Sequence, residues 1–147
     1  MTLGRVKLIF SDEKPLFITK ISVRINDINY GGHLGNDSLL SLLHEARLQM
    51  LTSKGYSEIN AFGNSLIMAD VMIAYKAEAF YGDELTVKIF AESLTARSFD
   101  LMYHVSTTRD GKTIDIAHAK TGMVCFDYKE RKIANMTNEF KLFLEGK

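Results

Sequence analysis

The chain has 147 residues, of which 46% are hydrophobic and 24% are charged, and its 18 basic and 18 acidic side chains balance at neutral pH. This composition predicts one globular domain over residues 1–147 and excludes an intrinsically disordered chain. No run of Lys or Arg exceeds two residues, so we expect neither nucleic acid nor an anionic membrane as a partner.

A reducing, cytoplasmic location is the expectation from cysteine use and from the absence of targeting signals. Cys125 is the one cysteine, which excludes an internal disulfide and a cysteine-rich zinc site, and we expect it to be buried packing. The first fifteen residues do not have the pattern of a signal peptide. No segment reaches the ~18 apolar residues that a membrane span needs.

The first clear element is a strand over residues 17–29, in which apolar side chains alternate with polar ones. Asp27 and Asn29 continue the inward-facing row just where the strand runs out. Inward polar residues at a strand end serve either a binding site or the cap of a turn. The glycine-rich segment that follows, with Gly31, Gly32 and Gly35, lets a ligand approach the backbone closely.

A long helix is predicted over residues 37–54, with Asn36 as its N-cap and Gly55 just past its end. Its apolar stripe is wide enough to need cover from most directions. Arg47 falls within this stripe, so we expect it to extend its head group outward or to pair with a carboxylate such as Asp27. The unpaired N–H groups at the start of the helix suit a polarised carbonyl or a phosphate.

The rest of the chain reads as four strands with hairpin-like connections and no helix between them. Gly122 marks a bulge or a close backbone approach within the last strand, and a short helix is expected from Asn138. These features predict an α+β fold in which an antiparallel five- to six-stranded sheet wraps one long central helix. The four predicted strands are residues 65–80, 84–98, 99–108 and 113–128, the last two joined by a turn at Asp110-Gly111.

The junction between the first strand and the helix carries a family motif. It reads R-x-x-D-x-N-x-x-G-H-L-x-N, followed after eight residues by E-A-R, and comprises Arg24, Asp27, Asn29, Gly32, His33, Leu34, Asn36 and Glu45-Ala46-Arg47. It resembles the opening of hotdog-fold acyl-CoA thioesterases of the 4-hydroxybenzoyl-CoA thioesterase-like branch. A looser likeness at residues 75–77 and 82–85 extends the resemblance to about residues 17–128. The topology deduced above agrees with the hotdog fold.

The resemblance implies a mechanism with one departure. In that branch the second acidic residue of a D-x-D pair is the catalytic carboxylate, and a backbone N–H at the start of the central helix polarises the thioester carbonyl. In this sequence, Asn29 occupies the position of the catalytic carboxylate. The N–H groups around Asn36 occupy the position of the oxyanion donor. An amide is neither a base nor a nucleophile at neutral pH, so the carboxylate mechanism does not transfer. The resemblance then implies that Asn29 and His33 orient thioester and water while Asp27 or Glu45 activates the water.

Each candidate also has a purely structural interpretation. Asp27 could cap a turn, Asn29 could adopt a left-handed turn conformation, and His33 could be a loop hydrogen-bonder. Glu45 lies in a polar strip that either faces solvent or, in a hotdog dimer, borders the cleft of the partner, where desolvation would raise its pKa. The residues expected to bind substrate are Gly32, Gly35, Asn36 and Asp70.

The predicted function is hydrolysis of an acyl thioester, either acyl-CoA or an acyl-carrier thioester, by a homodimer or a dimer of dimers. It needs no cofactor beyond the coenzyme A of the substrate. Two alternatives stay open: a non-catalytic acyl-CoA or acyl-carrier binding module, for which Asn29 argues, and a hotdog hydratase or dehydratase using His33 with Glu45. The Pro-Gly-rich stretch that usually accompanies that pair is absent. His104 and His118 lack the clustering of metal ligands, so no metal is predicted.

Overall fold

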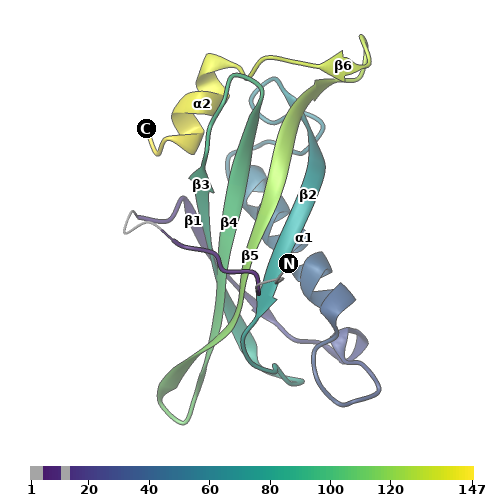
Figure 1. Ribbon diagram of the computed structural model, residues 1–147, viewed down its shortest axis with the longest axis vertical. Helices are drawn as coiled ribbons and strands as arrows, with labels where there is room; N and C mark the ends of the chain where they lie inside the picture. Colours follow the sequence, from purple (N-terminus) through teal and green to yellow (C-terminus); the bar gives the residue numbers. More distant parts are fainter. Residues whose placement is uncertain (1–4, 11–13) are drawn as a thin grey trace, which may run out of the picture.

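The computed structural model describes residues 5–10 and 14–147, and these form one antiparallel sheet with one long helix on one face (Figure 1). The strands run in the order β1-β3-β4-β5-β2, and β6 pairs with β5. This arrangement confirms the predicted α+β hotdog architecture. The elements are β1 (Phe17–Ser22), the short 3-10 helix η1 (Ile25–Asp27), α1 (Asn36–Thr52), β2 (Ser65–Tyr75), β3 (Glu84–Glu92), β4 (Ser98–Arg109), β5 (Lys112–Asp127), β6 (Lys132–Ile133) and α2 (Asn138–Leu144).

The core lies between α1 and the concave face of the sheet. The apolar stripe of α1 is fully buried there, and each such leucine contributes about 1.5–3 kcal/mol relative to an exposed one. The predicted terminal helix is present as α2, and its Phe140 packs edge-on against Phe99 of β4 with ring centroids 5.2 Å apart. Cys125 is buried, as predicted. In the described residues, neither helix is long and apolar enough to cross a membrane.

The first predicted strand is too long. β1 ends at Ser22, and the chain then turns through η1. The alternation of residue types continues to Asn29, but the Asp27 carboxylate accepts a hydrogen bond from the Arg24 N–H at 2.8 Å and closes a turn. The Arg24 N–H is therefore bonded to a nearby side chain and not to a neighbouring strand. β2 and β3 also end earlier than predicted, at Tyr75 and Glu92.

The helix boundaries differ from the prediction by one or two residues. Asn36 is the first residue of α1 and is not its N-cap. That position is held by Gly35, with φ −72° and ψ 152°, which has no side chain to accept a hydrogen bond. At the other end Ser53 is the C-cap, so Gly55, with φ 82°, lies one residue beyond the predicted place.

Arg47 is buried and pairs with a carboxylate, which is one of the two predicted outcomes, but the carboxylate belongs to Glu58 and not to Asp27. Its Nε lies 2.9 Å from Oε2 of Glu58, and its guanidinium also donates to the hydroxyl of Tyr103 at 3.1 Å. Asp27 lies near the start of α1, where its carbonyl accepts from Gly35. The loop after α1 instead brings Glu58 back over the middle of the helix.

Two register shifts interrupt the sheet. One lies between Met68 and Asp70 of β2, where Asp70 pairs with Gly122. A Cβ on Gly122 would collide with the Asp70 carboxylate, so the predicted bulge or close approach at this glycine is confirmed. The other lies where Val105 and Ser106 of β4 pair with residues 117 and 115 of β5, leaving Ile116 as an extra residue.

Candidate active site

The loop that feeds α1 is closed by Asn29. Its Oδ1 accepts hydrogen bonds from the N–H groups of Gly31 at 2.9 Å and His33 at 3.4 Å, while its own N–H donates to the His33 carbonyl at 2.9 Å. Gly32 has φ 85°, and a Cβ added there would meet nothing, so conformation rather than space requires the glycine. This network holds His33 next to the N-terminus of α1.

The first turn of α1 presents free backbone donors. The N–H groups of Asn36, Asp37 and Ser38 have no hydrogen-bond acceptor among residues 5–10 and 14–147. Since Gly35 cannot cap them, these donors and the positive end of the helix dipole are available to a ligand oxygen. This is the environment that stabilises the oxyanion of a thioester during attack.

A pocket of about 260 Å³ lies between the start of α1 and the end of β2. Its polar lining includes His33, Asn36 and Glu78, and its apolar wall includes Tyr75 and Ile116. A hydrogen bond of 2.7 Å from the Leu34 N–H to the Ala79 carbonyl ties the two sides together. The first residue of α1, Asn36, and the half-buried imidazole of His33 therefore line the same pocket.

Two side chains of this pocket, His33 and Glu78, are placed to accept protons. His33 Nδ1 lies 3.2 Å from the Leu34 carbonyl, which accepts only from a protonated nitrogen, so Nε2 is left as the acceptor. Nε2 lies 4.0 Å from Oε1 of Glu78, too far for a direct hydrogen bond but bridged readily by one water. Burial, together with the charge of Asp37, raises the pKa of Tyr75 and keeps this wall neutral.

The two predicted carboxylates lie elsewhere in the single chain. Asp27 and Glu45 line a second hollow of about 470 Å³, between α1 and the β1 side of the sheet. There Asp27 caps η1, and Glu45 accepts a hydrogen bond of 2.7 Å from Gln49. Within one chain, neither carboxylate is brought to His33.

Of the residues expected to bind substrate, Gly35 and Asn36 line the first pocket. Asp70 faces away from α1, because it packs over Gly122 and its Oδ1 accepts from Nζ of Lys120 at 2.8 Å. The core side of β5 is set by its neighbour Thr121, which bonds to the buried Tyr103 hydroxyl. The structure therefore brings Asn29, His33, Gly35 and Asn36 together and leaves Asp70 on the other face.

Sequence reasoning missed Glu78. It stands three residues after Tyr75, directly behind the Tyr75-Lys76-Ala77 stretch that carries the looser family likeness. A carboxylate that follows a family-like strand end was the available signal. The predicted strand over residues 65–80 includes Glu78, whereas β2 ends at Tyr75 and leaves Glu78 in the segment beside His33.

Comparisons with known proteins identify the family of the chain. Residues 23–144 match the model of the thioesterase-like superfamily. A 1,4-dihydroxy-2-naphthoyl-CoA hydrolase of Acaryochloris marina is 26% identical in an alignment of 129 residues that covers 84% of this chain and 92% of the relative.

Solved structures give the same result. A 1,4-dihydroxy-2-naphthoyl-CoA thioesterase from Synechocystis superposes with a TM-score of 0.75 at 26% identity, covering 87% of this chain and 94% of that one. A variant of 4-hydroxybenzoyl-CoA thioesterase complexed with 4-hydroxybenzoyl-CoA gives 0.76 at 14% identity, with 87% and 97% covered, a likeness of fold. The chain thus belongs to the thioesterase-like superfamily, as its sequence resemblance implied.

Proposed function

We propose that this chain is an acyl-CoA thioesterase, which hydrolyses the thioester to a free acid and the coenzyme A thiol. The observation that carries the proposal is the set of free N–H groups in the first turn of α1, at Asn36, Asp37 and Ser38, next to a pocket that Asn36 and His33 line. The homology to thioesterases supports the same reaction. In it the water oxygen bonds to the carbonyl carbon, the carbon–sulfur bond breaks, and the leaving thiolate takes up a proton.

In the proposed mechanism, the thioester carbonyl oxygen accepts hydrogen bonds from the start of α1, which favours the negative charge that develops there. His33 Nε2 and Glu78 hold the attacking water between them, and the Glu78 carboxylate takes its proton. Asn29 orients the substrate through its Nδ2, the side-chain atom that the loop network does not use.

The acyl group is proposed to be aromatic. The two relatives at 26% identity are named for 1,4-dihydroxy-2-naphthoyl-CoA, an aromatic acyl thioester. The wall formed by Tyr75, Ile116 and Leu39 is apolar and suits a flat ring. Aromatic acyl-CoAs should therefore turn over faster than straight-chain acyl-CoAs of similar size.

The test is release of thiol from a panel of aromatic and aliphatic acyl-CoAs. Glu78→Gln should lower kcat by about 10²–10⁴-fold, the usual contribution of a general base. Glu139→Gln, an exposed glutamate in the first turn of α2, is the matched control and should keep full activity. Full activity of Glu78→Gln would remove Glu78 from the mechanism. Tight binding of acyl-CoA without turnover on any substrate would leave only a binding module.

Replacing Asn29 with Asp separates an enzyme from a binder. The loop uses Oδ1 of Asn29 only as an acceptor, so an aspartate can keep the same two hydrogen bonds. A hydrolase that depends on the amide should lose activity, whereas a non-catalytic binder could gain it from the new carboxylate. The binding module and the hydratase are not favoured by the comparisons, because the named relatives are thioesterases.

The active form is proposed to be a cytoplasmic homodimer or a dimer of dimers. β2 is an edge strand of eleven residues, and it exposes Met68, Val71, Met72 and Tyr75. An exposed apolar edge favours pairing with a second copy, which would also extend the wall of the adjacent pocket. Light scattering should show a dimer or larger species at micromolar concentration, and a stable monomer would contradict the proposal.

A further inference from the structure

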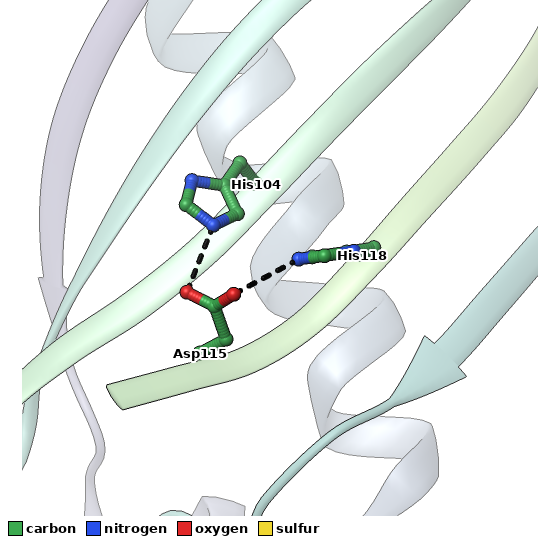
Figure 2. Close-up of side chains that lie close together, drawn as sticks. All are labelled: His104, Asp115 and His118. Atoms are coloured by element: carbon green, nitrogen blue, oxygen red, sulfur yellow. Dashed lines mark hydrogen bonds and ion pairs between the residues drawn. The ribbon is translucent and has the colours of Figure 1, made fainter. Parts of the chain in front are cut away.

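Three metal-ligand side chains converge on the face of the sheet opposite α1 (Figure 2). His104 of β4 and His118 of β5 are directly paired across the two strands. Both imidazoles point their Nε2 atoms at Asp115, whose two carboxylate oxygens lie 3.0 Å from His104 and 3.3 Å from His118. The reasoning that led to no predicted metal, that these histidines do not cluster, is therefore wrong.

The bulge at Ile116 creates this cluster. Asp115 and His118 are three residues apart, and in a regular strand such residues point to opposite faces. The extra residue between the pairs Val105–Ala117 and Ser106–Asp115 shifts the alternation by one and brings the carboxylate to the same side as the imidazole. Bulges often re-aim a side chain in this way next to functional sites.

The spacing fits a transition-metal ion. Tetrahedral ligands at about 2.0–2.1 Å from zinc are about 3.3 Å from one another. The two histidine–carboxylate distances are already close to that value, and one ligand atom from each of the three residues lies within 4.8 Å of the others. A small closing movement of two rings on neighbouring strands would complete the triangle.

The surroundings restrict the site and leave one side open. The side chains of His104 and His118 are 26% and 19% exposed, and Phe10 packs against both rings with centroid distances of 5.6 and 5.2 Å. The N-terminal segment that carries Phe10 crosses this face of the sheet (Figure 1). Asp115 is 48% exposed, so water can reach the open side and supply a remaining ligand.

The local charges are compatible with a bound cation. Burial opposes ionisation of Asp115, but the hydrogen bonds and charges of the two histidines outweigh it and hold the pKa of Asp115 below its ordinary value. Lys120, the next outward residue of β5, is drawn away by Asp70 at 2.8 Å and Asp100 at 4.0 Å. Lys88 pairs with His104 across β3 and β4 and is a further cationic neighbour.

We propose that His104, Asp115 and His118 bind a divalent transition metal ion such as Zn²⁺, with water completing its coordination. Two imidazole nitrogens and one carboxylate select a metal of this class over Mg²⁺ or Ca²⁺, which prefer oxygen ligands. The ion would join β4 to β5 on the outer face of the sheet. None of its three ligands lines the thioester pocket, which lies on the side of α1.

The test is isothermal titration of Zn²⁺ into tag-free protein that has been treated with a chelator and dialysed. The wild type should bind one equivalent per chain. Loss of a residue that merely orients a ligand costs about 10–100-fold in affinity, so His118→Gln and His104→Gln should each weaken binding by more than about 100-fold. His44→Gln, which removes an exposed histidine bonded to Glu58, is the matched control and should bind as the wild type does.

Asp115→Asn gives a second, less disruptive variant, since it keeps the shape of a half-exposed side chain. Far-UV circular dichroism of each metal-free variant shows whether the fold is intact, and the visible absorption bands of Co²⁺ bound to the wild type report the coordination geometry. Binding by the wild type that is no tighter than by His118→Gln and Asp115→Asn would overturn the proposal. That outcome would leave the proposed thioesterase activity untouched.

Discussion

Replacing Glu58 with Gln removes the negative charge that faces a buried arginine. The Arg47 side chain is 6% exposed and stays charged, because Tyr103 and Glu58 outweigh the opposing effect of burial and its pKa is raised. Removing one partner of a buried ion pair costs about 3–5 kcal/mol. Since Glu58 is itself 22% exposed, water can partly replace it, and we expect the lower end, about 3 kcal/mol. At about 2–4 °C per kcal/mol for a chain of this size, Tm should fall by roughly 6–12 °C.

Urea unfolding followed by circular dichroism measures this loss. The double variant Arg47→Met with Glu58→Gln removes both charges of this pair and should recover most of the stability. Glu139→Gln is the surface control and should stay within about 0.5 kcal/mol of the wild type. If Glu58→Gln also stayed within that range, the buried pair would not contribute as argued.

The same comparison has a defined pH dependence. Burial raises the pKa of Glu58, but the hydrogen bond and charge of Arg47, with a smaller contribution from His44, outweigh it and hold the pKa below its ordinary value of 4.5. A carboxyl with a depressed folded-state pKa contributes stability above its unfolded-state pKa and loses it as the pH falls through the folded-state value. The stability gap between wild type and Glu58→Gln should therefore be full above about pH 4.5 and shrink below it.

Thr137→Ala should cost about 1 kcal/mol in urea unfolding, because the Thr137 hydroxyl caps α2 by accepting from the Phe140 N–H at 3.2 Å. The Cys125 thiol should not react with an aromatic disulfide reagent at pH 8 until the protein unfolds, because burial raises its pKa to about 11. Glu45→Gln tests whether a second chain supplies the base: it should keep full kcat if Glu78 acts alone and lose about 10²-fold or more if Glu45 of a partner is needed.

The parts of the fold that rest on local periodicity were predictable from the sequence. The spacing of apolar residues over 37–54 predicts a buried helix, and the Asp110-Gly111 pair predicts a hairpin turn. The first strand was predicted to run on to Asn29 because its alternation of residue types persists. Nothing in that alternation shows that the Asp27 carboxylate closes a turn after Ser22.

The composition of the site was less predictable, because it depends on strand order. A helical wheel places Glu45 on a polar flank of α1 but cannot say which edge strand that flank faces. β1 and β2 lie at opposite edges of the sheet, so Glu45 faces the hollow beside β1 while His33 faces the pocket beside β2. For the same reason Glu78, at the end of β2, joins His33 although 45 residues separate them.

The bulge in β5 shapes both faces of the sheet at once. On the side of α1, Ile116 lines the pocket, and its carbonyl accepts hydrogen bonds from the N–H groups of Lys76 at 2.9 Å and Ala77 at 3.3 Å, which fix the pocket wall. On the outer side the same bulge turns Asp115 toward His118. A metal ion held by Asp115 would therefore restrict the backbone that carries the wall.

We expect Zn²⁺ to change the KM for acyl-CoA in the wild type and to leave it unchanged in His118→Gln, since only the wild type would hold the ion against the bulge. The reaction is best followed by loss of thioester absorbance, because the free thiol product itself binds zinc. The wild-type protein must first be shown by titration to be fully loaded with Zn²⁺. If its KM is then the same with and without Zn²⁺, metal binding at the bulge has no effect on substrate binding. The two faces would then share a stretch of backbone without sharing any free energy of binding.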